Sequence, residues 1–287
     1  MTHLILSFLI LINIPLLSAQ TKLQTITNCK LIPTDWADGD SFQIQTPTGE
    51  KYTVRLYGAD CLESNVTDRS DERRLREQRR YFGITKAKPT SQESIALAKK
   101  LGEKATQEVR KFTLRPFTIH TTFSDARGDG RYKRIYAFIT DPDGKDLASH
   151  LVEKGLARAY GVSRMTKDGQ SRDEYRETLS DYELKAAKLG AGAWAHTNWD
   201  TLPSERKQHR IEEAEAAIAM GKDSIREGFS LNPNTSPRDT IMRLKGIGES
   251  IANRIIENRP YQTAEDLLKV PGIGQKTLEN MRPYLKF

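Results

Sequence analysis

Short runs of alternating apolar and polar residues restrict what the first half of this chain can fold into. Residues 41–45 alternate, residues 46–49 supply a turn, and residues 52–57 resume with β-forming side chains, which predicts a hairpin. Two further runs, 117–123 and 132–140, are joined by a glycine-rich segment and predict a second pair of strands. Short antiparallel strands of this kind predict a small barrel.

Three segments around these strands have the spacing of amphipathic helices. Residues 90–114 place apolar side chains on one helical face, and Thr90 and Glu93 have the spacing of a capping box. Residues 148–160 and 175–189 follow the strands and are predicted as two further helices. We therefore expect helices packed against the barrel.

The segment 65–88 has a different composition. Its basic residues outnumber its four acidic residues. The basic residues are Arg69, Arg73, Arg74, Arg76, Arg79, Arg80, Lys86 and Lys88. We expect an exposed basic insertion, which is either a solvated charged helix or a surface that contacts nucleic acid.

Charge and cysteine content narrow the class of partner. Lys and Arg number 45 against 38 Asp and Glu, and this net charge of +7 attracts polyanions, with nucleic acid as the first candidate. The two cysteines, Cys29 and Cys61, are too few for a structural zinc site. Whether they form a disulfide or remain free thiols stays open, because spacing in sequence does not give separation in space.

The start of the chain has the pattern of a signal peptide. An apolar run over residues 4–17 closes on Ser18, Ala19 and Gln20, which predicts cleavage after Ala19 and removal of residues 1–19. The run is shorter than the roughly 20 residues that span a bilayer. We expect a secreted or periplasmic protein without a membrane span after cleavage, and an uncleaved anchor is the alternative.

Five charged side chains could together cleave a phosphodiester. Asp40 and Asp60 are hard oxygen ligands suited to Ca²⁺ or Mg²⁺. Arg55 and Arg134 have planar guanidinium groups that bind phosphate oxygens in a bidentate manner. Glu63 lies three residues beyond a predicted metal ligand, and it could reach a metal-side water as a general base.

These residues lie in three segments, 38–41, 54–63 and 132–134, that resemble the active-site signature of the staphylococcal nuclease family. The resemblance covers about residues 31–199. It implies an α+β fold in which an OB-type five-stranded β-barrel packs against helices. It also implies calcium ligands at Asp40, Asp60 and the Cys61 backbone carbonyl, with magnesium or manganese as alternatives, and a catalytic trio of Arg55, Glu63 and Arg134.

The chain departs from this family's pattern at several positions. Cys61 and Leu62 stand where the family usually has Thr and Pro, Gly130 stands where an acid is expected, and the basic segment 65–88 is an insertion. Since all five charged side chains are present, we expect an active site. The alternative is an inactive barrel rim that keeps its ion pairs.

The C-terminal residues contain two copies of one motif, over residues 244–252 and 270–278. Both resemble helix-hairpin-helix motifs, and residues 231–287 look like the tandem module of competence-type DNA receptors. We expect DNA phosphates to bind at the two Gly-Ile-Gly turns and a nearby lysine; these residues are Gly246, Ile247, Gly248, Gly272, Ile273, Gly274 and Lys276. A protein-interaction module is the alternative.

The sequence therefore predicts a signal peptide (1–19), a nuclease-like barrel domain (25–199), a helical linker (200–230) and a small all-α DNA-binding domain (231–287). The function expected first is an exported, metal-dependent endonuclease that cleaves DNA, with RNA as a further candidate substrate, and shows little sequence specificity. The alternative is a catalytically impaired protein that captures external DNA.

Overall fold

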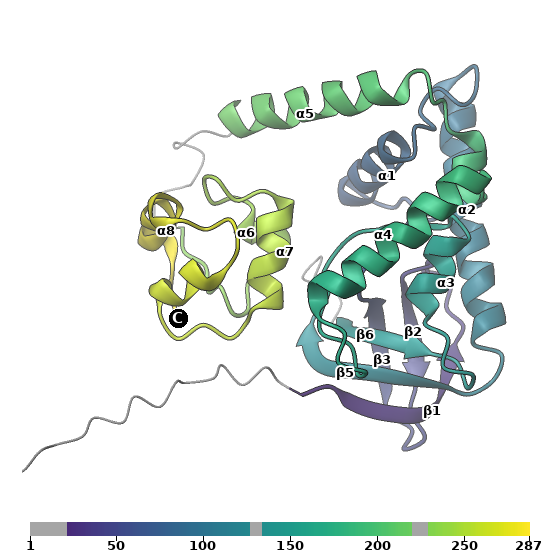
Figure 1. Cartoon of the computed structure of the whole chain (residues 1–287), viewed down its shortest axis with the longest axis horizontal. Coiled ribbons are helices and arrows are strands. Elements are labelled where there is room, and N and C mark those ends of the chain that lie inside the picture. Colours follow the sequence, from purple (N-terminus) through teal and green to yellow (C-terminus); the bar gives the residue numbers. More distant parts are fainter. Residues whose placement is uncertain (1–21, 127–133, 220–228) are drawn as a thin grey trace, which may run out of the picture.

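The computed structural model describes residues 22–126, 134–219 and 229–287. The predicted signal peptide and Gly130 lie outside these residues. Figure 1 shows a barrel with helices against it, the long helix α5 (Leu202–Ala219) above it, and a separate group of helices at the C-terminal end. Within the described part of the chain, no helix has both the length and the apolar character that crossing a membrane requires.

Five strands close into a barrel. Their order is β1 (Gln24–Ile32), β2 (Ser41–Gln45), β3 (Lys51–Leu56), β6 (Arg134–Thr140) and β5 (Phe117–Asp125). β3 and β6 are parallel, and the other neighbours are antiparallel. Gly49 closes the β2–β3 hairpin with a φ of 88°, a conformation that favours glycine. The prediction of an α+β fold built on an OB-type barrel is confirmed.

The segment predicted as one helix over residues 148–160 is two elements, so that prediction was wrong. Helix α3 (Leu147–Glu153) ends before Gly155, whose φ of 65° does not continue a helix. The chain then forms strand β7 (Ala157–Ala159), which pairs antiparallel with β4 (Ala59–Cys61). The helical periodicity of the sequence hid this strand because it is only three residues long.

Helices α2 (Ser91–Phe112) and α4 (Arg172–Leu189) confirm two predicted helices. α2 begins at the predicted capping box of Thr90. It packs directly on the chain that follows β4, because a Cβ atom on Gly102 would lie 2.3 Å from the carbonyl oxygen of Leu62. α2 therefore supports the loop that carries several candidate site residues.

We expected the basic segment 65–88 to be exposed, but part of it is buried. It forms α1 (Arg69–Tyr81), and the buried side chains of this helix are Leu75, Gln78 and Arg79. Several arginines at its surface pair with acids: Arg73 with Glu77, Arg76 with Glu72 and Arg80 with Glu212. This pairing favours the charged-helix interpretation over a nucleic-acid surface, and the buried face requires a separate explanation.

The C-terminal helices enclose a second hydrophobic core. They are α6 (Arg238–Ile241), α7 (Glu249–Glu257) and α8 (Gln275–Met281). Ile247 and Ile273 are each 5% exposed and lie in this core. Short 3-10 helices cover Gly192–His196, Ala264–Lys269 and Arg282–Tyr284.

Cys29 and Cys61 do not form a disulfide. Both are free, buried thiols. The Cys29 Sγ atom lies 3.5 Å from the carbonyl oxygen of Ile26. The Cys61 Sγ atom packs closely against Gly39, because a Cβ atom added to Gly39 would lie 2.7 Å from it. Of the two alternatives that the sequence left open, the structure has free thiols.

Candidate active site

Two buried carboxylates and one arginine form the centre of the candidate site. Asp40 is 2% exposed and Asp60 is 4% exposed. Arg55 lies between them: its Nη1 atom is 3.2 Å from Asp40 Oδ1, and its Nη2 atom is 2.9 Å from Asp60 Oδ1. The β2–β3 register places Arg55 opposite Ser41, next to Asp40, so the hairpin itself brings these groups together.

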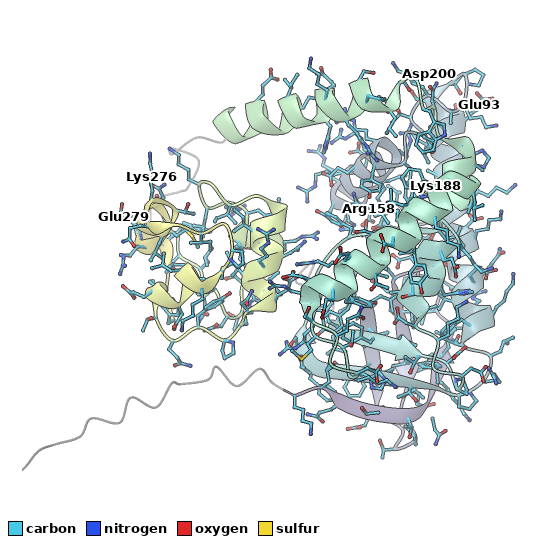
Figure 2. The ribbon with its side chains drawn as sticks, in the orientation of Figure 1. Glu93, Arg158, Lys188, Asp200, Lys276 and Glu279 are labelled. Atoms are coloured by element: carbon cyan, nitrogen blue, oxygen red, sulfur yellow. The ribbon has the colours of Figure 1, made fainter. Side chains whose placement is uncertain are left out.

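A second arginine, which the sequence did not single out, binds the same carboxylate. Arg158 lies opposite Asp60 in the β4–β7 pair, and its Nε atom donates to Asp60 Oδ2 at 2.8 Å. Its guanidinium group stacks over the ring of Tyr160, 4.0 Å from the centroid. Burial would raise the pKa of Asp60, but Arg158 and Arg55 outweigh it and lower this pKa to about 2. Figure 2 labels Arg158.

Arg134 reaches the site from strand β6. Its Nη1 atom is 3.4 Å from Ser41 Oγ, and the Nη1 atom of Arg55 is 3.3 Å from the same oxygen. The two predicted phosphate-binding arginines therefore converge on one point, although 79 positions separate them (134 − 55). Two guanidinium groups at this spacing can bind oxygens of a single phosphate.

Glu63 is buried near the carboxylates of Asp40 and Asp60. It is 6% exposed, and its Oε1 atom accepts a hydrogen bond from Arg74 Nε at 2.7 Å. Burial raises the pKa of Glu63 to about 7, against the opposing effect of Arg74. A carboxylate with a pKa near neutrality suits a general base.

Asp38 is a further carboxylate at the site that the sequence analysis did not assign. Its Oδ1 atom accepts backbone hydrogen bonds from Asp40 at 3.3 Å and from Ser41 at 2.8 Å. Burial raises the pKa of Asp38 well above its usual range, and the neighbouring Asp40 and Glu63 raise it further. Asp38 thus holds the chain at the start of β2 in the geometry that aims Asp40 inward.

The oxygens expected to bind a cation are of a suitable kind, but they already accept hydrogen bonds. Gln78 Nε2 donates to Asp60 Oδ2 at 3.0 Å and to the Cys61 carbonyl at 2.6 Å. Asp40 Oδ2 accepts from the Cys61 backbone N–H at 2.9 Å. Among the described residues, no group of three or more His, Cys, Asp or Glu side chains is arranged to hold a metal ion. Two carboxylates and a carbonyl match the ligands that calcium prefers, so this donor set fits a cation, although Gln78, Arg55 and Arg158 hold these oxygens in this structure.

Three further residues at this site escaped the sequence analysis for different reasons. Arg158 lay inside a segment predicted as helix, which gave no reason to place it opposite Asp60. Gln78 and Arg74 lie in the insertion, where the resemblance offered no counterpart. The spacing of Arg74 and Gln78, one helical turn apart, was the signal that could have placed them on one face.

Comparison with known proteins agrees with this geometry. Residues 53–196 match the family described as staphylococcal nuclease homologue, and this is just over half of the chain. The chain belongs to that family. The match includes the strands that carry Arg55, Arg134 and Arg158, and we call this part the nuclease-homologue domain.

The C-terminal residues have their own relatives. Residues 229–286 match the helix-hairpin-helix motif. ComE operon protein 1 of Bacillus subtilis (strain 168) is 38% identical over 60 residues, which are 20% of this chain and 29% of that protein. Photosystem II extrinsic protein U is 32% identical over 59 residues in Trichodesmium erythraeum (strain IMS101) and in Picosynechococcus sp. (strain ATCC 27264 / PCC 7002 / PR-6). These matches cover 21% of this chain and 42% and 43% of the two proteins, so the chain spans less than half the length of each relative.

Each of the two Gly-Ile-Gly turns precedes a helix. Gly246 and Gly272 adopt φ values of 83° and 96°, which only glycine adopts readily. Gly248 and Gly274 are exposed and cap α7 and α8. Figure 2 shows Lys276 at the outer edge of the C-terminal helices, away from the barrel.

The C-terminal helices contact the nuclease-homologue domain through one buried acid. Glu257 of α7 accepts hydrogen bonds from the Ser163 backbone N–H at 2.8 Å and from Arg172 Nη1 at 3.3 Å, and it also pairs with Arg176. Its side chain is 1% exposed. Burial raises the pKa of Glu257 to about 7, although Arg176 acts to lower it.

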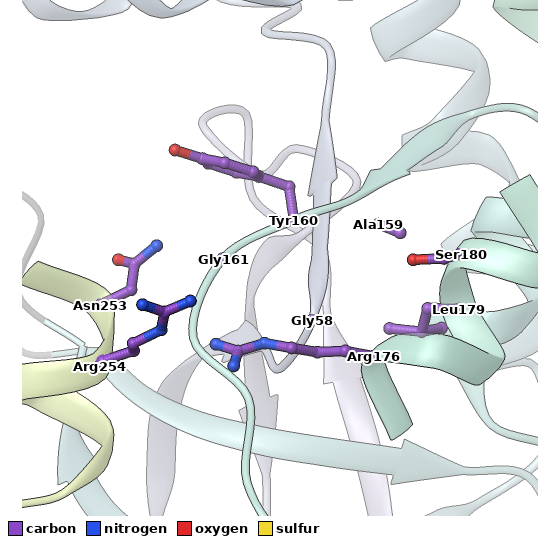
Figure 3. Close-up of a pocket in the computed structure, with 9 residues that line it drawn as sticks. All are labelled: Gly58, Ala159, Tyr160, Gly161, Arg176, Leu179, Ser180, Asn253 and Arg254. Carbon is purple, nitrogen blue, oxygen red and sulfur yellow. The ribbon is translucent and has the colours of Figure 1, made fainter. Parts of the chain in front are cut away.

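A cavity of about 230 Å³ lies beside this contact. Figure 3 shows the guanidinium groups of Arg176, from α4, and Arg254, from α7, pointing toward each other across it. Arg254 Nη1 also donates to the Pro271 carbonyl at 3.0 Å, next to the second hairpin. The cavity thus joins the hairpin surface to the nuclease-homologue domain.

Proposed function

We propose that this protein is an exported, metal-dependent endonuclease that cleaves DNA, and RNA as a further substrate, with little sequence preference. The observation that carries the proposal is the convergence of Arg55 and Arg134 on Ser41 Oγ, beside the carboxylates of Asp40 and Asp60. A phosphodiester at this point would have guanidinium groups where negative charge develops and carboxylates where a cation can bind.

Each residue has a distinct task in this proposal. Asp40, Asp60 and the Cys61 carbonyl would hold calcium, which when bound supplies positive charge to the phosphate. Arg55 and Arg134 would orient the phosphate by bidentate hydrogen bonds. Glu63 would accept a proton from the attacking water, because a carboxyl with a pKa near 7 is largely ionised at slightly alkaline pH and still basic enough to accept it.

The C-terminal module would hold the substrate by its backbone. Glycines at both hairpins leave room for a phosphate to approach the main chain. Arg176 already pairs with Glu257, so of the two facing arginines this proposal assigns Arg254 to a DNA phosphate. Contacts of this kind position DNA without reading its sequence.

A plasmid-nicking assay tests the enzymatic part. We expect nicking with Ca²⁺, less or none with Mg²⁺ and none with EDTA. Glu63→Gln should lower the rate by about 10²–10⁴-fold, because it removes the base but no cation. A rate for Glu63→Gln within a few-fold of the wild type would refute the role of Glu63.

One observation favours the alternative, a DNA-binding protein with an impaired active site. Asp60 and the Cys61 carbonyl already accept hydrogen bonds from Gln78, and Glu63 accepts one from Arg74. Duplex binding without nicking under any metal condition would support this alternative.

Export is a separate part of the proposal and rests on the sequence of residues 1–20. N-terminal sequencing of the protein recovered outside the cytoplasm should begin at Gln20. A protein that stays in the cytoplasm with residues 1–19 intact would contradict it.

A further inference from the structure

The side chain of Gln78 lies against two of the three oxygens assigned to the cation. Its Nε2 atom is 3.0 Å from Asp60 Oδ2 and 2.6 Å from the Cys61 carbonyl oxygen. Gln78 is fully buried, at 0% exposed. The two hydrogens of one amide nitrogen thus bind the oxygens that a cation would need. Gln78 and a cation therefore cannot occupy these oxygens at the same time.

The same helical face also holds the candidate base. Arg74 lies one turn before Gln78, and it contacts Glu63 Oε1 at 2.7 Å. Gln78 Oε1 in turn accepts from the Glu63 backbone N–H at 2.9 Å. One face of α1 therefore occupies the cation ligands and the base together.

The attachment of α1 is uneven along its length. Its C-terminal end is anchored, because Arg79 Nη2 donates to Ser94 Oγ at 2.9 Å and Phe82 is fully buried. At the other end Thr67 and Arg69 are exposed. Gln78 lies next to Arg79 at the anchored end, so its backbone is held in place and rotation of its side chain would release the cation ligands.

We propose that the Gln78 side chain is a gate over the active site and competes with the cation for Asp60 and the Cys61 carbonyl. Cation binding and rotation of the Gln78 side chain are then one coupled event, and this rotation also takes the acceptor Gln78 Oε1 away from the Glu63 backbone N–H. This inference rests on the proposed function, because it takes Asp60 and the Cys61 carbonyl as cation ligands.

Calcium titration of the intact chain tests the competition without using activity. Gln78→Met keeps the length of the side chain and removes both hydrogen-bond donors. We expect it to bind calcium roughly ten- to a hundredfold more tightly than the wild type. This factor corresponds to the free energy of the two hydrogen bonds, to Asp60 and to the Cys61 carbonyl, that calcium no longer has to displace. Gln92→Met, at an exposed position of α2, is the matched control and should bind calcium as the wild type does.

Hydrogen exchange of the unmodified protein provides a second measurement if Gln78→Met does not fold. Saturating calcium should speed exchange of the Glu63 backbone amide, which loses its acceptor in Gln78, and leave α2 unchanged. Equal calcium affinities for wild type and Gln78→Met, with unchanged exchange of the Glu63 amide, would overturn the gate and leave the metal-dependent nuclease standing. Absence of calcium binding in every chain, including Gln78→Met, would overturn both the gate and the proposed metal dependence.

Discussion

Glu63 links the stability of the metal-free protein to pH. Burial raises its pKa from 4.5 to about 7, against the effect of Arg74. Between these pH values the folded chain keeps a proton that the unfolded chain has released, so this group makes the free energy of unfolding fall as pH rises. We expect the stability of the wild type, relative to Glu63→Gln, to decline from pH 4.5 to pH 7 in EDTA. Denaturant unfolding at several pH values measures this difference, and a difference that stays constant or increases would contradict the assignment.

Most of the charged residues that the sequence predicted for the site lie close together in the chain. Asp40, Arg55, Asp60 and Glu63 lie within 24 consecutive positions (40 to 63), so a short motif contains them. Arg158 is 98 positions from Asp60, and only the pairing of two three-residue strands brings them together. Such contacts depend on packing, which a local pattern does not encode.

Helix α2 gives a prediction at the scale of a single element. Replacing a glycine within a helix by alanine normally stabilises the protein by roughly 1 kcal/mol. At Gly102 we expect the opposite, a loss of about 1–3 kcal/mol, because the new Cβ atom would lie 2.3 Å from the Leu62 carbonyl oxygen and 3.0 Å from the Ser64 nitrogen.

Thermal and denaturant unfolding of Gly102→Ala measure this effect. Lys104→Ala, at an exposed position of α2, is the control and should change stability by no more than about 0.5 kcal/mol. Because the loop moved by Gly102→Ala carries Glu63, the same variant should lose nicking activity. A more stable and fully active Gly102→Ala would show that α2 does not brace this loop.

Periodicity predicted the elements well where they are long or end in clear turns. β2 spans the predicted residues 41–45, and α2 begins at the predicted capping box of Thr90. The failures are short or inserted elements: β7 was taken as helix, and α1 was expected to be exposed. In both cases tertiary contacts, with β4 and with the active site, override what the local pattern indicates.

At the scale of the whole molecule, the two hydrophobic cores predict a division of labour. Removing residues 231–287 should leave hydrolysis of short oligonucleotides intact, because all five predicted catalytic and ligand side chains lie between residues 40 and 134, outside the deleted part. It should weaken binding to long duplex DNA and flatten the dependence of affinity on salt, since fewer phosphate contacts release fewer counterions.

Binding titrations on long duplex at several salt concentrations measure this change. The deletion also exposes the partners of Glu257, so the full-length variant Arg254→Ala is needed as a second comparison. This variant should lower the slope of log affinity against log salt concentration by about one unit, and it keeps the contact of Glu257 with Arg176. Identical slopes for all three proteins would assign the C-terminal module to protein interaction.

The parallel pairing of β3 with β6 also sets the order in which the site can appear during synthesis. Chains emerge from the ribosome N-terminal end first. The proposed cation ligands and Glu63 are made before position 64, and α1, which covers them, follows directly. The second edge of β3 can pair only after β6, which carries Arg134, has been synthesised. Arg158 is synthesised later still, as part of β7. A growing chain therefore contains the covering helix before it contains Arg134 and Arg158, so an unfinished molecule has the carboxylates and Arg55 but lacks the second arginine proposed to hold the phosphate.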